Sequence, residues 1–288
     1  SELGTNRDTP CSTDIGMIAY YFQKYQFDGL IIVGGFEGLI SLHELERSRD
    51  VYPGFRIPMV LIPATLSNNV PGTEYSLGSD TALNSLTSYC DILKWSASSI
   101  RGRVFVVDCQ GGNSGYLATV ADLAVGAHAS YVPEEGISID QLMQDVSNIA
   151  EAYERMDECG TETKETGKLV LKTTNASKAI DVEKLSQIMT SEAGGKFDAR
   201  SAVRGHIQQG GNPSPIDRTR ATRFAIRAVQ FIEDNQMVVN KYRHANEVYD
   251  DAFDKVMRST AAVLGVKGSG IVFSSVRKVY DDETDVKK

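Results

Sequence analysis

The sequence predicts an α/β protein built from doubly wound, mainly parallel sheets. Three times, a short apolar run of strand length leads into a polar or glycine-containing turn and then into a helical pattern; the runs are residues 30–33, 57–62 and 104–107. Unbroken apolar runs of this kind are typical of parallel strands buried on both faces. Strand, turn and helix form half of a βαβ unit, so the repetition favours a sheet with a ligand crevice at the carboxyl ends of its strands.

Composition and charge limit the possible partners. The chain has 288 residues, 41% of them hydrophobic, and a net charge of −8, which argues against a general nucleic-acid binder because phosphate neutralisation needs excess Lys and Arg. No apolar run is long enough to span a bilayer, and nothing resembles a signal peptide. The widely spaced Cys11, Cys90, Cys109 and Cys159 form neither a metal pattern nor a disulfide framework. We therefore expect no nucleic acid, no membrane and a reducing, cytoplasmic location.

The first ninety residues carry three stretches that suit a ligand. Residues 4–7 offer small side chains, backbone amides and one guanidinium, which suit a phosphate, although a plain surface loop is the simpler interpretation. A helix is predicted over 13–25, capped by Ser12 or Thr13. The glycine turn at 34–38 precedes another helix, and its amides either approach a phosphate or only form a tight turn.

The loop at residues 63–84 is the most informative of the three. It follows the second strand and is crowded with hydroxyls and amides, and such a loop at a strand's carboxyl end is where open α/β sheets bind ligands. A polar turn before a helix is the alternative. Asp80 is expected to cap the next helix, which places Cys90 in the core.

Further α/β units follow along the chain. The third strand ends in a glycine turn at 108–115. The later elements predicted are, in order, a helix at 116–126, a strand at 129–133, a helix at 139–156, an exposed polar loop at 158–167, a strand at 168–171 and a helix at 182–192 closed by Gly194 and Gly195. Thr173, Thr174 and Asn175 again supply hydroxyls and an amide at the end of a strand.

Residues 200–211 form the second informative stretch. Arg200 and His206 flank a predicted short strand, and a double glycine follows. A lone His is usually structural, but beside Arg200, Gln208 and Gln209 it favours an anion-binding role. Asp217 is expected to cap a helix whose apolar face is Ala221, Phe224, Ala225, Ala228, Val229 and Ile232. Residues 235–255 are predicted to form a charged, solvated and partly helical segment. Two strands are predicted at 261–265 and 271–273, and residues 281–288 are expected to fray.

Two stretches together resemble 6-phosphofructokinase: PATLSNNVPGTEYSLGSDTALN at 63–84 and GHIQQGGNPSPIDR at 205–218. Residues 4–7, 34–38 and 110–118 fit the same family, and the matches fall in family order over nearly the whole chain. In detail they resemble the C-terminal half of a eukaryotic, fungal α-type subunit, a half that arose by duplication of an ancestral kinase.

This resemblance implies the phosphofructokinase fold, with two lobes and a sugar-phosphate site between them. The approximate lobes are residues 1–78 plus 208–265, and residues 79–207 plus 266–288. The family pattern also places a first strand and glycine loop before Ser1, and a region with another basic residue after Lys288. Residues 1–288 are thus expected to be a half that is incomplete at both ends.

The resemblance further implies a binding site for the activator fructose 2,6-bisphosphate. The residues it places there are Arg7, Thr65, Leu66, Ser67, Asn68, Asn69, Arg103, Gln110, Gly111, Gly112, Thr174, Arg200, His206, Ile207, Gln208 and Gln209. Arg103 is expected to reach into a neighbouring subunit's site. Thr174 departs from the family, because many relatives carry Glu at that position.

Three further departures argue against catalysis. Ser67 and Asn69 stand where active halves carry carboxylates, one of which deprotonates the sugar hydroxyl; a general base is worth roughly 100- to 10,000-fold in rate. Phe36 replaces an acidic residue at the metal–nucleotide turn, and phosphoryl transfer depends on metal and charge placement. We therefore expect no catalytic residue and no metal ligand in this chain. Losing these carboxylates leaves the basic residues less opposed and better able to bind phosphate.

The sequence thus predicts the regulatory half of an ATP-dependent 6-phosphofructokinase, the glycolytic enzyme that converts fructose 6-phosphate and ATP to fructose 1,6-bisphosphate and ADP. Mg²⁺ and ATP are expected in the N-terminal catalytic half of the same polypeptide, and the other partners are phosphofructokinase subunits in a hetero-oligomer of α and β subunits. Two alternatives stay open: a catalytic half that uses Glu74 or Asp80 as base, and a degenerate half kept for subunit assembly.

Overall fold

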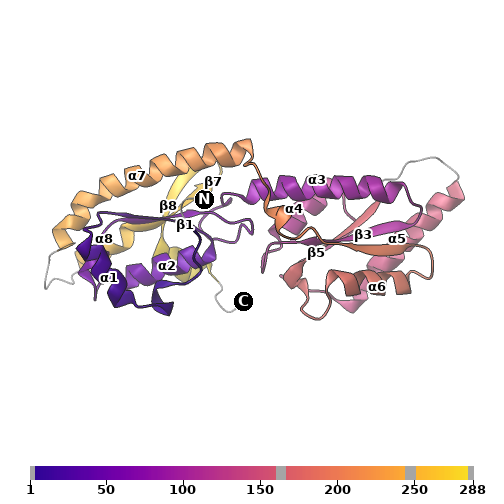
Figure 1. The fold of residues 1–288 in the computed structure, drawn as a ribbon, viewed down its shortest axis with the longest axis horizontal. Helices are drawn as coiled ribbons and strands as arrows, with labels where there is room; N and C mark the ends of the chain where they lie inside the picture. The colour runs from indigo at the N-terminus through magenta and orange to yellow at the C-terminus, as the bar shows by residue number, and fades with distance from the viewer. Residues whose placement is uncertain (1–3, 160–166, 244–250, 285–288) are drawn as a thin grey trace. The chain divides into compact units, whose positions relative to one another are not determined.

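The computed structural model describes residues 4–159, 167–243 and 251–284, and it divides the chain into two compact units. Unit 1 is made of Ser1–Leu77 and Pro215–Lys288, and unit 2 is the continuous segment Gly78–Ser214 (Figure 1). Each unit has its own four-stranded sheet with helices against it. The predicted α/β class with mainly parallel sheets is confirmed.

The sheet of unit 1 has the strand order β1-β2-β7-β8. Its strands are β1 (Leu30–Gly34), β2 (Met59–Pro63), β7 (Ala261–Lys267) and β8 (Gly270–Ser275). The first three are parallel, with Met59 opposite both Leu30 and Ala261, and β8 pairs with β7 in the antiparallel direction. Every residue of β2 is buried, as the unbroken apolar run predicts for a central strand.

Helices cover both faces of this sheet. They are α1 (Ile15–Lys24), α2 (Phe36–Arg47), α7 (Pro215–Arg243), α8 (Asp251–Ser259) and α9 (Val276–Glu283), with short 3₁₀ turns at Pro10–Ser12 and Pro53–Phe55. Leu61 and Val263 face α1, α2 and α9 in one core cluster. Val60 and Leu264 face α7 in another, and Figure 1 shows α7 and α2 on opposite sides of the sheet.

Unit 2 has a parallel sheet of order β4-β5-β3-β6. Its elements are α3 (Ser79–Ser98), β3 (Arg103–Cys109), α4 (Tyr116–Val125), β4 (Ala129–Tyr131), α5 (Ile139–Cys159), β5 (Lys168–Thr173), α6 (Val182–Glu192) and β6 (Asp198–Ala202), with 3₁₀ turns at Thr174–Ala176 and Gly205–Gln209. Val106 and Val170 share a core cluster with α5 and α6. The other side of the sheet from α6 carries α3 and α4 (Figure 1).

The three predicted helix caps are wrong. Asp14, not Ser12 or Thr13, caps α1, and its carboxylate accepts a hydrogen bond from the amide of Met17 at 3.0 Å. Helix α3 begins earlier than predicted, because Gly78 adopts a left-handed backbone with φ 90° at the N-cap. Asp80 and Asp217 consequently lie in the first turns of α3 and α7, where a carboxylate still interacts favourably with the helix dipole.

The predicted lobe boundaries need two corrections. Residues 266–288 belong to unit 1, because β8 folds back on β7 and α9 packs on α2. Residues 208–214 belong to unit 2, because the Gly205–Gln209 turn packs on α3 and the Gln208 side chain bonds to the end of β3. Each segment thus belongs to the unit whose elements it contacts.

Other differences concern exposure and strand position. Arg200 lies inside β6 and does not flank it. On α7, Phe224 and Ala228 are buried, whereas the expected core residue Val229 is 48% exposed. The charged stretch 235–255 is helical where it is described, at the end of α7 and the start of α8, and residues 244–250 lie outside the described part. Most of the loop predicted at 158–167 and the last four residues, 285–288, are outside it as well.

No helix among the described residues is both long enough and apolar enough to cross a membrane.

Candidate functional site

Three of the predicted ligand-binding stretches line one cavity of unit 1. This cavity measures about 430 Å³ and lies at the carboxyl ends of β1 and β2, where parallel strands present their loops at one edge. It is lined by Gly4, Thr5, Asn6, Arg7, Asp8, Ile32, Val33, Gly34, Gly35, Glu37, Gly38, Ser41, Ala64 and Thr65. The N-terminal segment, the glycine turn and the start of the loop after β2 therefore meet in one place.

The loop of residues 64–77, here called the Ser67 loop, is closed at its base. Ala64 and Leu77 form a bridge, and the Leu77 amide donates to the Pro63 carbonyl at 2.9 Å. Asn68 adopts a left-handed backbone with φ 49°, which Asn tolerates better than most residues. Its side chain accepts from the Ser76 amide at 2.6 Å and donates to the Glu74 carbonyl at 2.9 Å.

The side chains around Asn68 complete this loop. The Ser67 amide donates to the Thr65 hydroxyl at 3.2 Å. Leu66 and Ser67 are half-buried, whereas Asn69 is exposed. Asn68 thus fixes the loop from within, while Ser67 and Asn69 bring a hydroxyl and an amide to it and no carboxylate.

Of the two alternative bases, Glu74 does not line the cavity of unit 1, and Asp80 belongs to unit 2. The Glu74 carboxylate accepts from the Gly268 amide at 3.0 Å, in the turn between β7 and β8. The Asp80 carboxylate accepts from the Asn84 side chain at 3.2 Å, within α3. The carboxylates that do line the cavity are Asp8 and Glu37.

The glycine turn at 34–38 borders this cavity but brings no acidic side chain at residue 36. Phe36 begins α2 and packs against the core of unit 1, so it offers no oxygen at that turn. Among the described residues, no group of three or more His, Cys, Asp or Glu side chains could hold a metal ion.

In unit 2, the turn after β3 is held by a buried glutamine. Gln208 is fully buried, and its amide donates to the Asp108 carbonyl while accepting from the Gln110 amide at 2.9 Å. Gly111 and Gly112 have φ values of 144° and 60°. A Cβ on Gly111 would lie 2.6 Å from the Ser114 carbonyl oxygen, so this turn requires glycine.

Thr174 lies at the same end of the sheet, directly after β5. Its hydroxyl donates to the Asp108 carboxylate at 3.3 Å. Beside it, Lys172 is only 1% exposed, and its ammonium donates to the carbonyls of Thr173 and Thr174 at 3.1 and 3.2 Å. Burial raises the pKa of Asp108 and lowers that of Lys172.

The sequence reasoning assigned no role to Asp108 or Lys172. In the sequence, a charged residue at the end of an apolar run indicates only that a strand ends there. The strand register that places Asp108 opposite Lys172 cannot be derived from the sequence. The signal that was available is that both apolar runs end in a charged residue.

Arg103 and Arg200 share one carboxylate. Asp198 Oδ2 lies 3.3 Å from the Arg103 guanidinium and 3.1 Å from that of Arg200, whose side chains are 13% and 60% exposed. Arg103 opens β3, whereas Gln110 follows its other end, so about 20 Å of strand separates them at about 3.3 Å per residue. Within unit 2, Arg103 is therefore not brought to the Gln110 turn.

The remaining predicted residues lie in the turn after β6. His206, Ile207 and Gln209 are exposed on the Gly205–Gln209 turn, which Gly205 and Gly210 flank with φ values of 63° and 84°. The Ile207 carbonyl accepts from the Ser85 hydroxyl of α3 at 3.3 Å. Arg7 and residues 65–69 thus belong to unit 1, and all the other predicted site residues belong to unit 2.

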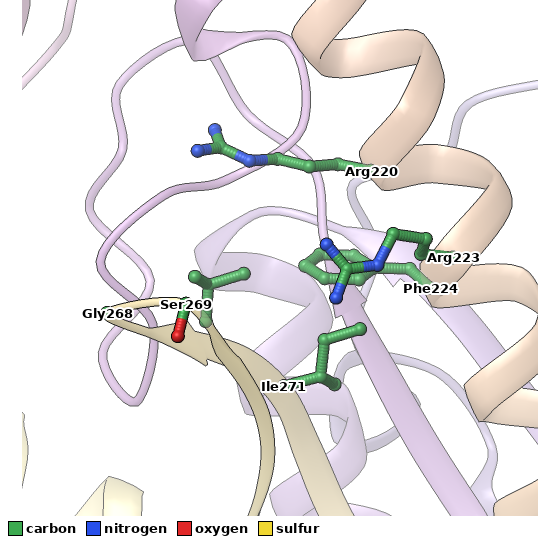
Figure 2. A pocket seen from close by; sticks show the side chains of 7 residues that line it. Arg220, Arg223, Phe224, Gly268, Ser269 and Ile271 are labelled. Atoms are coloured by element: carbon green, nitrogen blue, oxygen red, sulfur yellow. The ribbon is translucent and has the colours of Figure 1, made fainter.

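The sequence analysis did not anticipate a second, basic cavity in unit 1. It measures about 200 Å³ and is lined by Arg220, Arg223, Phe224, Val266, Gly268, Ser269 and Ile271. The two arginine side chains extend from α7 above the Gly268–Ser269 turn (Figure 2). Arg220 also lies over the Tyr75 ring, 4.5 Å from its centroid, which is cation–π distance.

Comparison with known proteins gives consistent matches. A family model described as Phosphofructokinase matches residues 1–232. The chain is 65% identical to the ATP-dependent 6-phosphofructokinase subunit beta of Saccharomyces cerevisiae, over 99% of this chain and 29% of the relative. It is 45% identical to the subunit alpha of Komagataella pastoris, over 99% of this chain and 30% of the relative. The expected α type is thus the less similar of these two.

Solved structures agree with these matches. The structure of phosphofructokinase from Saccharomyces cerevisiae superposes with a TM-score of 0.93 at 65% identity, covering 99% of this chain and 37% of that chain. A pyrophosphate-dependent phosphofructokinase from Nitrosospira multiformis shares the fold alone, with a TM-score of 0.68 at 13% identity over 92% of this chain and 63% of that chain. The chain spans about 30% of the length of the curated relatives it matches.

Proposed function

This chain belongs to the phosphofructokinase family, and we propose that it forms the C-terminal, regulatory half of a fungal ATP-dependent 6-phosphofructokinase subunit. The whole enzyme would transfer a phosphoryl group from ATP to fructose 6-phosphate. This half would bind the activator fructose 2,6-bisphosphate and would carry no catalysis of its own.

The observation that carries this proposal is the composition of the Ser67 loop. The loop keeps a closed, hydrogen-bonded form beside the cavity of unit 1, yet Ser67 and Asn69 supply no carboxylate. A serine hydroxyl is not a base at neutral pH, and a missing general base lowers the rate roughly 100- to 10,000-fold. Glu74 does not line that cavity, which weighs against its use as an alternative base.

Binding of a doubly phosphorylated sugar is supported by the cations and amides of the proposed site. Arg7 lies beside the amides of the glycine turn in the cavity of unit 1. Arg200 and His206 are exposed in unit 2. Each of them can form charge-assisted hydrogen bonds to phosphate. Because Gln208 is buried and bonded at both ends of its amide, we give it the role of positioning Gln110.

We place Mg²⁺ and ATP in the catalytic half of the polypeptide, because Phe36 supplies no carboxylate at the glycine turn of this one. The remaining partners we propose are α and β subunits in a cytoplasmic hetero-oligomer, in keeping with the relatives named subunit alpha and subunit beta. Fructose 2,6-bisphosphate would act by population shift, favouring the active state only by its differential affinity for that state.

The test is a binding titration of fructose 2,6-bisphosphate to the complete enzyme. Arg200→Ala and His206→Ala are each expected to weaken binding about tenfold or more, because each removes a charge-assisted hydrogen bond. Arg227→Ala, an exposed arginine of α7 outside the proposed set, should bind like the wild type. Unchanged affinity in both site variants would overturn the binding assignment and favour a structural half.

A second experiment addresses catalysis. The complete enzyme, with its catalytic half inactivated by substitution, is assayed for phosphorylation of fructose 6-phosphate, and no activity is expected. Turnover by such a protein would overturn the non-catalytic assignment. Ser67→Asp should weaken activator binding by adding a negative charge near the phosphates.

A further inference from the structure

Three polar side chains gather at the carboxyl end of β3 and β5. In the parallel register Asp108 lies opposite Lys172, so their side chains share one face of the sheet. Thr174 follows β5 directly, and its hydroxyl reaches across to the Asp108 carboxylate at 3.3 Å. The same end of the sheet carries the Gln110–Gly111–Gly112 turn, to which the proposed activator site is assigned.

The direction of this hydrogen bond restricts what Thr174 can do. A hydroxyl has one hydrogen, and an ionised carboxylate can only accept, so Thr174 must be the donor to Asp108. Both hydroxyl lone pairs then remain, and the residue is exposed. Toward a ligand, Thr174 is therefore an acceptor and suits a hydroxyl group of that ligand, which is a donor.

Both partners of this bond are held in place by buried groups. The Lys172 ammonium bonds the main-chain carbonyls of Thr173 and Thr174, which fixes the start of the Thr174–Ala176 turn. The Gln208 amide bonds the main chain of Asp108 and Gln110, which fixes the end of β3.

The charge of Asp108 is supported in the same way. Burial raises its pKa, and the bond from Thr174 and the charge of Lys172 act against that rise by favouring the carboxylate. An ionised carboxylate at this point disfavours a phosphate next to Thr174. The Lys172 ammonium does not offset this effect for a ligand, because it is buried and already bonded to two carbonyls.

We infer that Asp108 is a positioning residue that orients the Thr174 hydroxyl as an acceptor for one sugar hydroxyl of the activator, with Lys172 holding the Thr174 main chain. The Asp108 carboxylate is thus a negative group directly behind the Thr174 hydroxyl. The inference rests on the proposed function, and it assigns Thr174 to a hydroxyl and not to either phosphate.

The test combines side-chain and ligand changes in the complete enzyme. Binding of fructose 2,6-bisphosphate and of three analogues, lacking the hydroxyl at C1, C3 or C4, is measured by calorimetry. Thr174→Val should bind the parent compound about tenfold more weakly, since one hydrogen bond is lost. The analogue that lacks the partner hydroxyl should bind the wild type and this variant equally. Thr174→Ser should restore both the affinity and the discrimination.

Asp108→Asn tests the positioning role. Its amide can donate to Thr174, so the hydroxyl is no longer restricted to accepting from the ligand, and the discrimination among analogues should shrink. The wild type should bind the parent compound more tightly than this variant, and this difference in affinity should decrease as the pH falls and Asp108 becomes protonated. Asn175→Ala is the matched control, because Asn175 belongs to the same turn but bonds Asn113, and it should bind like the wild type.

The outcomes separate this inference from the proposed function. If the parent compound binds and Thr174→Val discriminates among the analogues as the wild type does, the inference is overturned while the proposed function stands. If the parent compound does not bind the wild type at all, both fail.

Discussion

Arg49 is fully buried, and its guanidinium donates hydrogen bonds to main-chain carbonyls and to one hydroxyl. It donates to the carbonyls of Phe55, Ile57 and Met257 and to the Thr260 hydroxyl. These groups come from the approach to β2 and from the region where α8 leads into β7. Burial lowers the pKa of Arg49 to about 10, which leaves it charged at neutral pH.

Arg49→Met is expected to destabilise the fold by about 3–5 kcal/mol, because it leaves several buried acceptors without a donor. Urea unfolding monitored by circular dichroism measures this loss. Arg47→Ala, an exposed arginine two residues earlier, should change stability by less than about 0.5 kcal/mol. Equal effects of the two substitutions would contradict the role given to Arg49.

His43 is a second buried polar residue with a distinct behaviour. Its ring stacks on that of Tyr280, with centroids 3.9 Å apart and planes 12° apart. Its Nδ1 atom has no hydrogen-bond partner among the described residues. Burial is the main cause that lowers its pKa below the ordinary value of 6.5, and Arg47 and Arg277 act in the same direction against Asp281 and Glu44.

This lowered pKa predicts a pH-dependent stability. Between the folded-state pKa and 6.5 the unfolded chain binds more protons at His43 than the folded one, so stability should fall as the pH drops below about 6.5. His43→Phe keeps the stacking and removes the titration. As the pH falls from about 7.5 to 5.5, the urea midpoint of this variant should rise relative to that of the wild type. A difference between the two midpoints that stays constant over this range would rule out the contribution of His43.

At the residue scale, the sequence predicts apolar burial better than polar partners. Cys90 is fully buried as expected, and burial raises its pKa to about 12, so it is an inert thiol. The caps failed because Ser, Thr and Asp compete within a few positions, and the backbone of Gly78 decides where α3 starts. Asp108 and Lys172 were missed because their partners lie far away in the sequence.

Among the elements, α9 is held to unit 1 by one buried ion pair as well as by apolar contacts. The Glu46 carboxylate of α2 is fully buried and accepts two hydrogen bonds from Arg277 of α9, at 2.8 and 3.1 Å. Arg277 also lies 3.5 Å from Asp254 of α8. Three helices therefore meet through this guanidinium.

Glu46→Gln should loosen α9 in particular, because it leaves Arg277 without its main counter-charge, and breaking a buried pair costs about 3–5 kcal/mol. Hydrogen exchange of the α9 amides should become faster than in the wild type. The control is Arg258→Ala, which removes an exposed pair with Asp254 and should have little effect. Unchanged exchange in α9 would show that apolar packing alone retains it.

Element prediction from the sequence succeeds where burial is strong on both faces. The strands β1, β2, β3 and β5 were found within a few residues, because their apolar runs are unbroken. β6 was displaced, since its residues are small or polar and it carries no unbroken apolar run. The length of α7 was underestimated, because most of its surface is exposed and its charged second half carries no apolar pattern.

On the scale of the whole molecule, the two units differ in how the chain builds them. Unit 2 is one continuous segment with its own core, whereas unit 1 needs segments from both ends of the chain. The central strand β2 of unit 1 pairs with β1 on one side and β7 on the other, so residues 1–77 alone lack one of the two partners of a fully buried strand.

Gly78–Ser214 expressed alone should therefore fold cooperatively, with a sigmoidal thermal transition and dispersed amide NMR signals. Residues 1–77 expressed alone should remain unfolded or aggregate, because the edge of β2 is open. A molten, non-cooperative unit 2 would contradict this expectation.

The lobe boundaries were the part of the architecture least accessible to sequence reasoning. The return of the chain to unit 1 at Pro215 was placed too early, because no composition change marks it. The residues after 266 were misassigned because an antiparallel β8 breaks the βαβ pattern that the other strands follow. By contrast, Arg7 and Thr65, which the sequence assigned to one site, line the same cavity, and the Gly34 turn joins them there.

The insertion of unit 2 into unit 1 has a consequence for synthesis on the ribosome. Met59 pairs with Ala261, so β2 emerges about 200 residues before its partner, which at about 5–20 residues per second means roughly 10 to 40 s. During that time unit 2 can fold, while an apolar strand of unit 1 waits with an unpaired edge. That edge stays open until β7 has been synthesised.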